Sequence, residues 1–260
     1  MRATCLWLTA LALVAAVPAL AADRAIQNGI DLWHTPPDGS TYVDFAKTPV
    51  PAGFFCAGSA PFTGRVVLEG VPLVTGANTQ LGNTDTIVQR LDDAVFNKRD
   101  VAFTRVQMRA LSLKSVNPID TACGQYNLTV GIDGQQPITR MKIVRESELG
   151  GHYWTALSIN AKVTFTPVAG SAKESLQFAL AVRFPSVPQP WQSTPTFQPK
   201  GSGFVLVDTD GDRAADTYLP GPSNFYPGAA GPNATIRRIC HEGDDGQHCE
   251  SEPWCGCCPC

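Results

Sequence analysis

The feature that most constrains the fold is a succession of short β-rich runs between residues 41 and 184. Polar and apolar side chains alternate in 140–144 and 162–168, as is typical of half-buried strands. The chain also contains 23 Gly and 21 Pro, which favour turns over helices. We therefore expect an all-β fold, an antiparallel β-sandwich over residues 22–184. Seven runs support this expectation: 64–70, 86–91, 103–108, 128–132, 141–145, 161–166 and 176–184.

Two stretches of this region resemble one another and favour a duplicated β unit over residues 56–118 and 123–168. Each stretch begins with a cysteine, Cys56 or Cys123, and continues with three similar blocks in the same order. The alternative is that short strands with Gly-x-Pro turns simply look alike. The blocks are 66–73, 87–90 and 110–118 in the first unit and 130–138, 143–146 and 160–167 in the second.

Residues 1–21 have the features of a signal peptide. Arg2 gives a charged start, residues 6–17 are apolar, and 19–21 form an A-x-A cleavage pattern. A retained anchor is the alternative, but the apolar run is shorter than the roughly 20 residues that cross a bilayer. We expect no other transmembrane segment. The sequence thus predicts a secreted protein that is extracellular, at the cell surface or in the periplasm.

Charge and motifs argue against two classes of function. The 20 Lys and Arg residues are spread along the chain against 23 Asp and Glu, with a formal net charge of −3. Nucleic acid is therefore not an expected partner, because phosphate binding needs a clustered basic surface. The chain has no G-x-S-x-G, P-loop, H-E-x-x-H or Rossmann glycine motif. We expect a structural or binding role in preference to catalysis.

Cysteine usage fits an exported protein. Eight cysteines follow the predicted leader, an even number that favours disulfides in an oxidising compartment. Cys56 and Cys123 are isolated from the others, and we predict that they form a bridge between the two β units.

The remaining six cysteines form a Cys-rich tail, residues 240–260, which has almost no aliphatic side chain and needs covalent or metal staples to be ordered. A disulfide scaffold is the favoured interpretation. A Zn²⁺ or Cu site that also uses His241 and His248 is one alternative, and redox chemistry at a C-x-x-C motif is another. The cysteines are Cys240, Cys249, Cys255, Cys257, Cys258 and Cys260.

An acidic hairpin is expected at 201–221, between proline-rich linkers at 185–200 and 222–239. Its carboxylates occupy positions 1, 3, 5 and 9 of a loop, with a backbone carbonyl at position 7. Ca²⁺ prefers six to eight oxygen ligands, so this spacing predicts a calcium site. An acidic, solvated turn is the alternative. The predicted ligands are Asp208, Asp210, Asp212, the carbonyl of Ala214, and Asp216.

The acidic segment resembles the D-x-D-G-D loops of FG-GAP, thrombospondin type 3 and dockerin modules over about 17 residues. The resemblance implies that the acidic positions are calcium ligands. The sequence departs from these loops at Arg213, where they usually carry a glycine. Arg213 would therefore need a positive φ or a looser turn.

Two clusters of histidine and aromatic residues offer a candidate ligand groove. Aromatic rings at such sites stack against sugars, so the clusters indicate a carbohydrate- or protein-binding module. Packing in the core or at its rim is the alternative for each ring. The residues are Trp33, His152, Tyr153 and Trp154. Three hypotheses thus stand: a calcium-stabilised structural or binding protein, a glycan- or protein-binding module, and a metal-handling or redox protein.

Overall fold

A computed structural model describes residues 25–147, 150–168, 174–183, 188–193 and 203–227, and the backbone of 234–235, 241–243 and 246–248. Within these residues the chain forms strands and no helix. Fourteen of the strands belong to one sheet, and only the β2–β18 pairing is parallel. The expectation of an all-β antiparallel sandwich is confirmed.

The strands in chain order have the following bounds: β1 Ala25–Ile26, β2 Gly29–His34, β3 Tyr42–Asp44, β4 Arg65–Gly70, β5 Thr86–Arg90, β6 Ala94–Val95, β7 Val101–Ser115, β8 Ile119–Thr121, β9 Gly124–Ile132, β10 Ile138–Ser147, β11 Gly150–Thr155, β12 Ser158–Pro167, β13 Leu176–Arg183, β14 Gln189–Gln192, β15 Phe204–Val207, β16 Thr217–Pro220, β17 Tyr226–Pro227, β18 Ala234–Thr235, β19 His241–Gly243 and β20 Gly246–His248.

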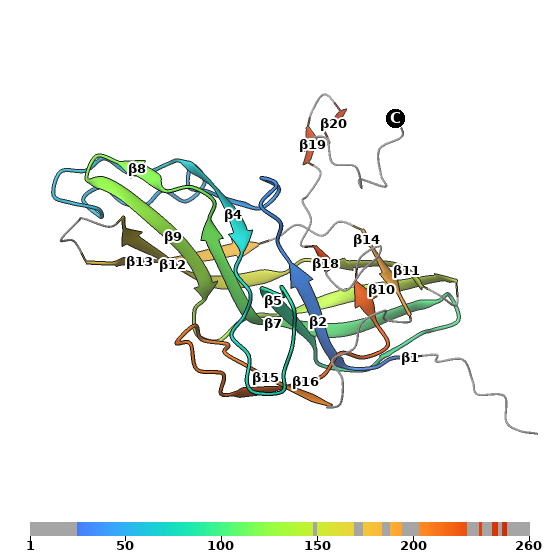
Figure 1. Ribbon diagram of the computed structural model, residues 1–260. Helices are drawn as coiled ribbons and strands as arrows, with labels where there is room; N and C mark the ends of the chain where they lie inside the picture. The colour runs from blue at the N-terminus through green and yellow to red at the C-terminus, as the bar shows by residue number, and fades with distance from the viewer. Residues whose placement is uncertain are drawn as a thin grey trace, which may run out of the picture.

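The 15-residue strand β7 organises the sheet, because its neighbours change along its length. Its first part pairs with β10 on one side and β5 on the other, whereas its last residues pair with β9 and β4. The sheet therefore has two halves that share β7 (Figure 1). The first half contains β2, β5, β10, β11, β14 and β17, and the second contains β3, β4, β9, β12 and β13.

A single core runs through both halves. In β12 the residues Ile159, Ala161, Val163 and Phe165 alternate with more exposed positions, and all four are buried. A group of aromatic side chains fills the core of each half of the sheet. In the first half the group is Phe96, Tyr153, Trp191 and Phe225. In the second half it is Phe45, Phe54, Phe55, Phe62, Phe165 and Phe178.

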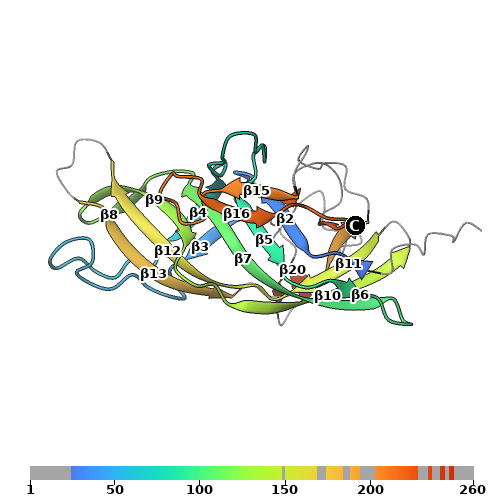
Figure 2. The same cartoon turned by 90° about the horizontal axis from the view of Figure 1, so that it is seen from below.

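The β15–β16 hairpin covers part of the opposite face of the first half. Val205, Val207 and Leu219 form a smaller buried cluster with apolar side chains of β2, β5 and β7. Figure 2 shows the hairpin lying over these strands. It therefore closes one end of a sheet face whose other end, on β7, β10 and β11, carries exposed side chains.

The segments predicted as linkers contribute to the sheet where the structure describes them. β14 lies within 185–200 and pairs with β11, and its Trp191 is buried. In 222–239, β17 pairs with β14, and Phe225 belongs to the core. Proline is tolerated there because β17 ends the described strand order and Pro190 of β14 pairs with β11 alone.

The duplicated unit stays a prediction. The first and third blocks pair in each predicted unit, as β4 with β7 and β9 with β12. The second blocks differ. β5 pairs with β2 and with β7, the third block of its own unit, whereas β10 pairs with β7 and β11.

Candidate functional site

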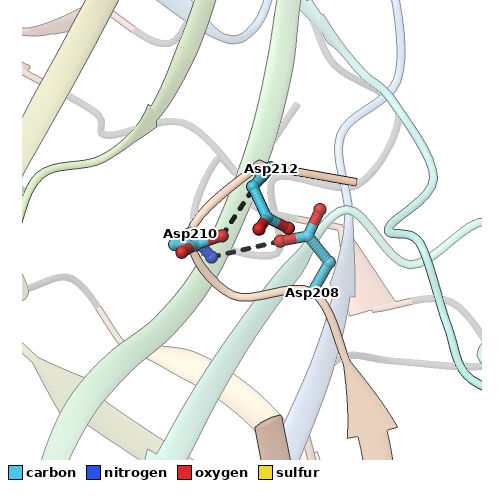
Figure 3. A group of neighbouring side chains, drawn as sticks. All are labelled: Asp208, Asp210 and Asp212. Carbon is cyan, nitrogen blue, oxygen red and sulfur yellow. Dashed lines mark hydrogen bonds between the residues drawn. The ribbon is translucent and has the colours of Figure 1, made fainter. Parts of the chain in front are cut away.

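The acidic loop, residues 208–216, joins β15 to β16. Asp208, Asp210 and Asp212 offer carboxylate oxygens that lie within 4.8 Å of one another. Asp208 is buried at the end of β15, whereas Asp210 and Asp212 are exposed. Figure 3 shows the carboxylates of Asp208 and Asp212 pointing toward each other across the loop. The structure therefore brings together three of the four predicted carboxylate ligands.

Backbone amides of the loop orient these carboxylates. Asp208 accepts the N–H groups of Asp210, Gly211 and Arg213 at 2.7–3.2 Å. Asp210 and Asp212 each accept one N–H from the residue two positions later, at 3.1 and 2.7 Å. Such local bonds hold an Asp-rich turn in place. Asp210 and Asp212 each keep their second oxygen for another partner.

Arg213 adopts a left-handed backbone conformation. Its φ is 74°, and that of Gly211 is 82°. A left-handed conformation costs a residue with a Cβ roughly 1–2 kcal/mol, a cost that glycine does not have. Of the two alternatives that the sequence allowed, a positive φ or a looser turn, the structure has the positive φ, and the loop is strained at this position.

Asp216 lies apart from the three clustered carboxylates. One of its oxygens accepts a hydrogen bond from the hydroxyl of Thr217 at 3.0 Å. Three carboxylates supply only part of the six to eight oxygens that Ca²⁺ prefers. The Ala214 carbonyl, Asp216 and water would have to supply the others.

The predicted bridge between Cys56 and Cys123 is present. The two Cα atoms lie 6.0 Å apart, and the residues are separated by 67 positions in the sequence. Cys56 lies in the loop between β3 and β4, and Cys123 lies in the turn between β8 and β9. The disulfide therefore ties two loops together at the end of the second half, next to the phenylalanine-rich core.

The cysteines of the tail lie outside the described residues: Cys240, Cys249, Cys255, Cys257, Cys258 and Cys260. Of this tail, the structure describes the backbone pairing of β19 with β20, in which His241 lies opposite His248. The disulfide, Zn²⁺ or Cu, and redox hypotheses for the tail stay predictions.

The four residues of the predicted ligand groove do not share one surface. Trp33 and Tyr153 are buried in the core. His152 and Trp154 lie on the opposite face of β11, because side chains alternate along a strand. Their rings are 6.5 Å apart, and His152 Nδ1 lies 2.8 Å from a carboxylate oxygen of Glu146. Only His152 and Trp154 remain candidates for contact with a ligand.

A buried ion pair is a feature that the sequence argument missed. Arg90 Nε donates to Asp31 Oδ1 at 3.0 Å, and both side chains are fully buried. Arg90 also donates to the Gln27 carbonyl and, at 2.8 Å, to the Ser223 hydroxyl. Its guanidinium carbon lies 4.9 Å from the centre of the Phe225 ring. The ion pair thus joins β2 and β5 to the segment around Ser223, which lies more than 100 residues away in the sequence.

Burial controls the ionisation of this pair. It raises the pKa of Asp31 to about 6, although the charge and hydrogen bond of Arg90 act to lower it. The second Asp31 oxygen is buried and has no hydrogen-bond partner among the described residues. The alternation of β2 offered one clue, since it places Asp31 on the same face as the buried Trp33.

A second buried carboxylate, Asp85, also escaped the sequence argument. It accepts the Thr35 N–H at 2.6 Å and the hydroxyls of Thr35 and Thr86 at 3.1 and 2.7 Å. Burial raises its pKa, and these hydrogen bonds oppose that shift. His34 Nδ1 lies 3.2 Å from Asp85 and 3.0 Å from the Asn83 carbonyl, so this nitrogen carries the proton that faces both acceptors. These hydrogen bonds to Asp85 satisfy the buried polar groups of Thr35 and Thr86 next to the end of β2.

Comparisons with family models, curated proteins and solved structures give no match to this chain. Among the described residues, no helix has the length and apolar character needed to cross a membrane.

Proposed function

We propose that this chain is an exported, calcium-stabilised structural or binding protein of the cell surface or extracellular space. The observation that carries the proposal is the Cys56–Cys123 disulfide, which closes a long loop in the main body of the fold. Such bridges persist in oxidising compartments and are rare in a reducing cytosol. The leader-like residues 1–21 support the same location.

Calcium is proposed to stabilise the β15–β16 hairpin through the acidic loop. Three carboxylates lie close together, and Asp208 is 6% exposed. Their mutual repulsion disfavours this arrangement, and a divalent cation would offset that repulsion. Hard oxygen ligands favour Ca²⁺ over Zn²⁺ or Cu, which prefer nitrogen and sulfur.

We expect the loop to bind Ca²⁺ weakly, with a dissociation constant on the order of 10⁻⁴–10⁻³ M, as in other extracellular modules. At free calcium tenfold above this constant, binding would raise the free energy of unfolding by about 1.4 kcal/mol. Asp210→Ala should abolish binding. Arg213→Gly should tighten it, because glycine relieves the positive φ and removes a nearby positive charge. Titration calorimetry measures each constant.

The matched control is Asp120→Ala, which removes an exposed carboxylate from β8 in the second half of the sheet. This variant should bind calcium as the wild type does. Asp216→Ala tests whether the fourth predicted ligand takes part, and a weakened affinity would assign it to the site. Absence of wild-type binding at millimolar calcium, or weaker binding by Arg213→Gly, would show that the loop is only an acidic turn.

The second candidate function is binding of a carbohydrate or protein. It is favoured by the placement of His152 and Trp154 on the outer face of β11, next to exposed side chains of β10. The third hypothesis, metal handling or redox chemistry at the tail, is tested by metal analysis of the purified protein before and after its cysteines are blocked.

A further inference from the structure

The open part of the outer sheet face gathers cations and aromatic rings from three strands. We name as the cationic face the side chains of Phe103, Arg105 and Arg109 on β7, Arg140 and Lys142 on β10, and Trp154 on β11. In the strand register Arg140 lies opposite Arg105, and Lys142 lies opposite both Phe103 and Trp154. Opposed residues in a sheet have Cβ atoms roughly 4.5–5.5 Å apart, so these side chains form one contiguous surface.

Positive charge on this face exceeds the negative charge beside it. Arg105 forms an ion pair with Asp92, with two contacts of 2.7 Å. Arg109 donates to the neutral side chain of Gln89. Arg140 and Lys142 form no ion pair with the carboxylates of the described residues. Asp92 offsets the charge of Arg105, so the positive charge of the face that no carboxylate of the described residues offsets lies on Arg109, Arg140 and Lys142.

Aromatic rings hold the two unpaired cations in place. The guanidinium carbon of Arg140 lies 3.9 Å from the centre of the Phe103 ring. The ammonium nitrogen of Lys142 lies 4.9 Å from the centre of the Trp154 ring. Such contacts reduce the freedom that each side chain must lose on binding. Beside them, a hollow of about 360 Å³ is lined by Phe103, Ile138 and Arg140 and by the Arg105–Asp92 ion pair, among others.

The cationic face spans three neighbouring strands, and this breadth favours an extended, acidic polysaccharide. We propose that the cationic face binds a polymer of uronic acids, with Arg140 and Lys142 contacting its carboxylates and Trp154 packing against a sugar ring. Arginine suits carboxylates because its guanidinium donates two parallel hydrogen bonds, and aromatic rings suit the apolar faces of sugars. A polymer chain can lie along a sheet surface across several strands, whereas a compact ligand would contact few of these groups.

Single-stranded nucleic acid fits the face less well, because it needs open aromatic planes on which successive bases stack, and Arg140 lies over the Phe103 ring. This inference rests on the proposed role as an exported binding protein, but it does not require calcium.

The test is titration calorimetry of the full chain with polygalacturonate, in buffer containing a calcium chelator and little salt. The wild type should bind, and its affinity should fall as salt is added. The double variant Arg140→Gln/Lys142→Gln should bind about tenfold or more weakly, because two charge-assisted contacts are lost. Trp154→Ala should weaken binding several-fold without changing the salt dependence, whereas Trp154→Phe should retain most of the affinity.

The matched control is Lys162→Gln/Arg183→Gln, which removes the same charge from β12 and β13 in the other half of the sheet. It should bind like the wild type, and thermal melts should show that each variant is folded. Absence of wild-type binding, or equal loss in the control, would overturn the inference. Equal affinity for double-stranded DNA or for phosphatidylserine vesicles would also overturn it. Failure here leaves the calcium test of the proposed function unaffected.

Discussion

Replacing Arg90 with Met is expected to lower the free energy of unfolding by about 3–5 kcal/mol, because it leaves the Asp31 carboxylate buried without its partner. The substitution also removes the donors to the Gln27 carbonyl and to Ser223, which connect this site to the segment before β17. Urea denaturation, followed by tryptophan fluorescence, measures the loss. The effect is large because neither member of the pair is exposed to water that could replace the contact.

The double variant Asp31→Leu/Arg90→Met is the control. It removes both charges and should recover most of the lost stability, since an apolar pair of similar volume often replaces a buried ion pair at little cost. Removing Arg90 takes away the charge and the hydrogen bond that lower the pKa of Asp31, so the pKa of Asp31 in the single variant lies above the wild-type value of about 6. The loss should therefore shrink as the pH falls toward about 6, because Asp31 is then protonated in the variant while it is still ionised in the wild type. A loss that is equally large in both variants and independent of pH would contradict this account.

Removing the Cys56–Cys123 bridge is expected to lower the free energy of unfolding by about 4 kcal/mol. The bridge closes a loop across a sequence separation of 67 residues and thereby reduces the conformational entropy of the unfolded chain. The double variant Cys56→Ala/Cys123→Ala isolates this bridge, because it leaves the cysteines of the tail unchanged. Urea denaturation without reductant compares the variant with the wild type.

Reduction provides the control for this second prediction. If the bridge accounts for the stability difference, a reductant should lower the stability of the wild type toward that of the double variant. The variant itself should change little unless bridges in the tail also contribute. Equal stability of the oxidised wild type and the double variant would show that the disulfide does not constrain the unfolded chain.

The sequence by itself determined the fold class, because polar and apolar residues alternate with the period of a strand and turn residues recur between the runs. It also predicted the Cys56–Cys123 bridge, since the even cysteine count after the predicted leader left these two isolated cysteines to pair. The strained backbone conformation of Arg213 followed from the loop pattern, in which a glycine usually stands at this position. In a loop that needs a left-handed residue, a missing glycine transfers the strain to whichever residue replaces it.

The tertiary structure alone decided which face of each strand is buried and which strands are neighbours. Trp33 and Tyr153 were candidates for a ligand groove, yet they lie in the core, because alternation defines two faces without saying which faces inward. Arg140 and Arg105 are 35 positions apart in the sequence, and only the register of β7 with β10 places them opposite each other. Long-range strand pairing thus gathers basic residues that are dispersed along the chain into one surface. The pairing of β2 with β5 brings Asp31 to Arg90 in the same way, and local sequence does not encode either arrangement.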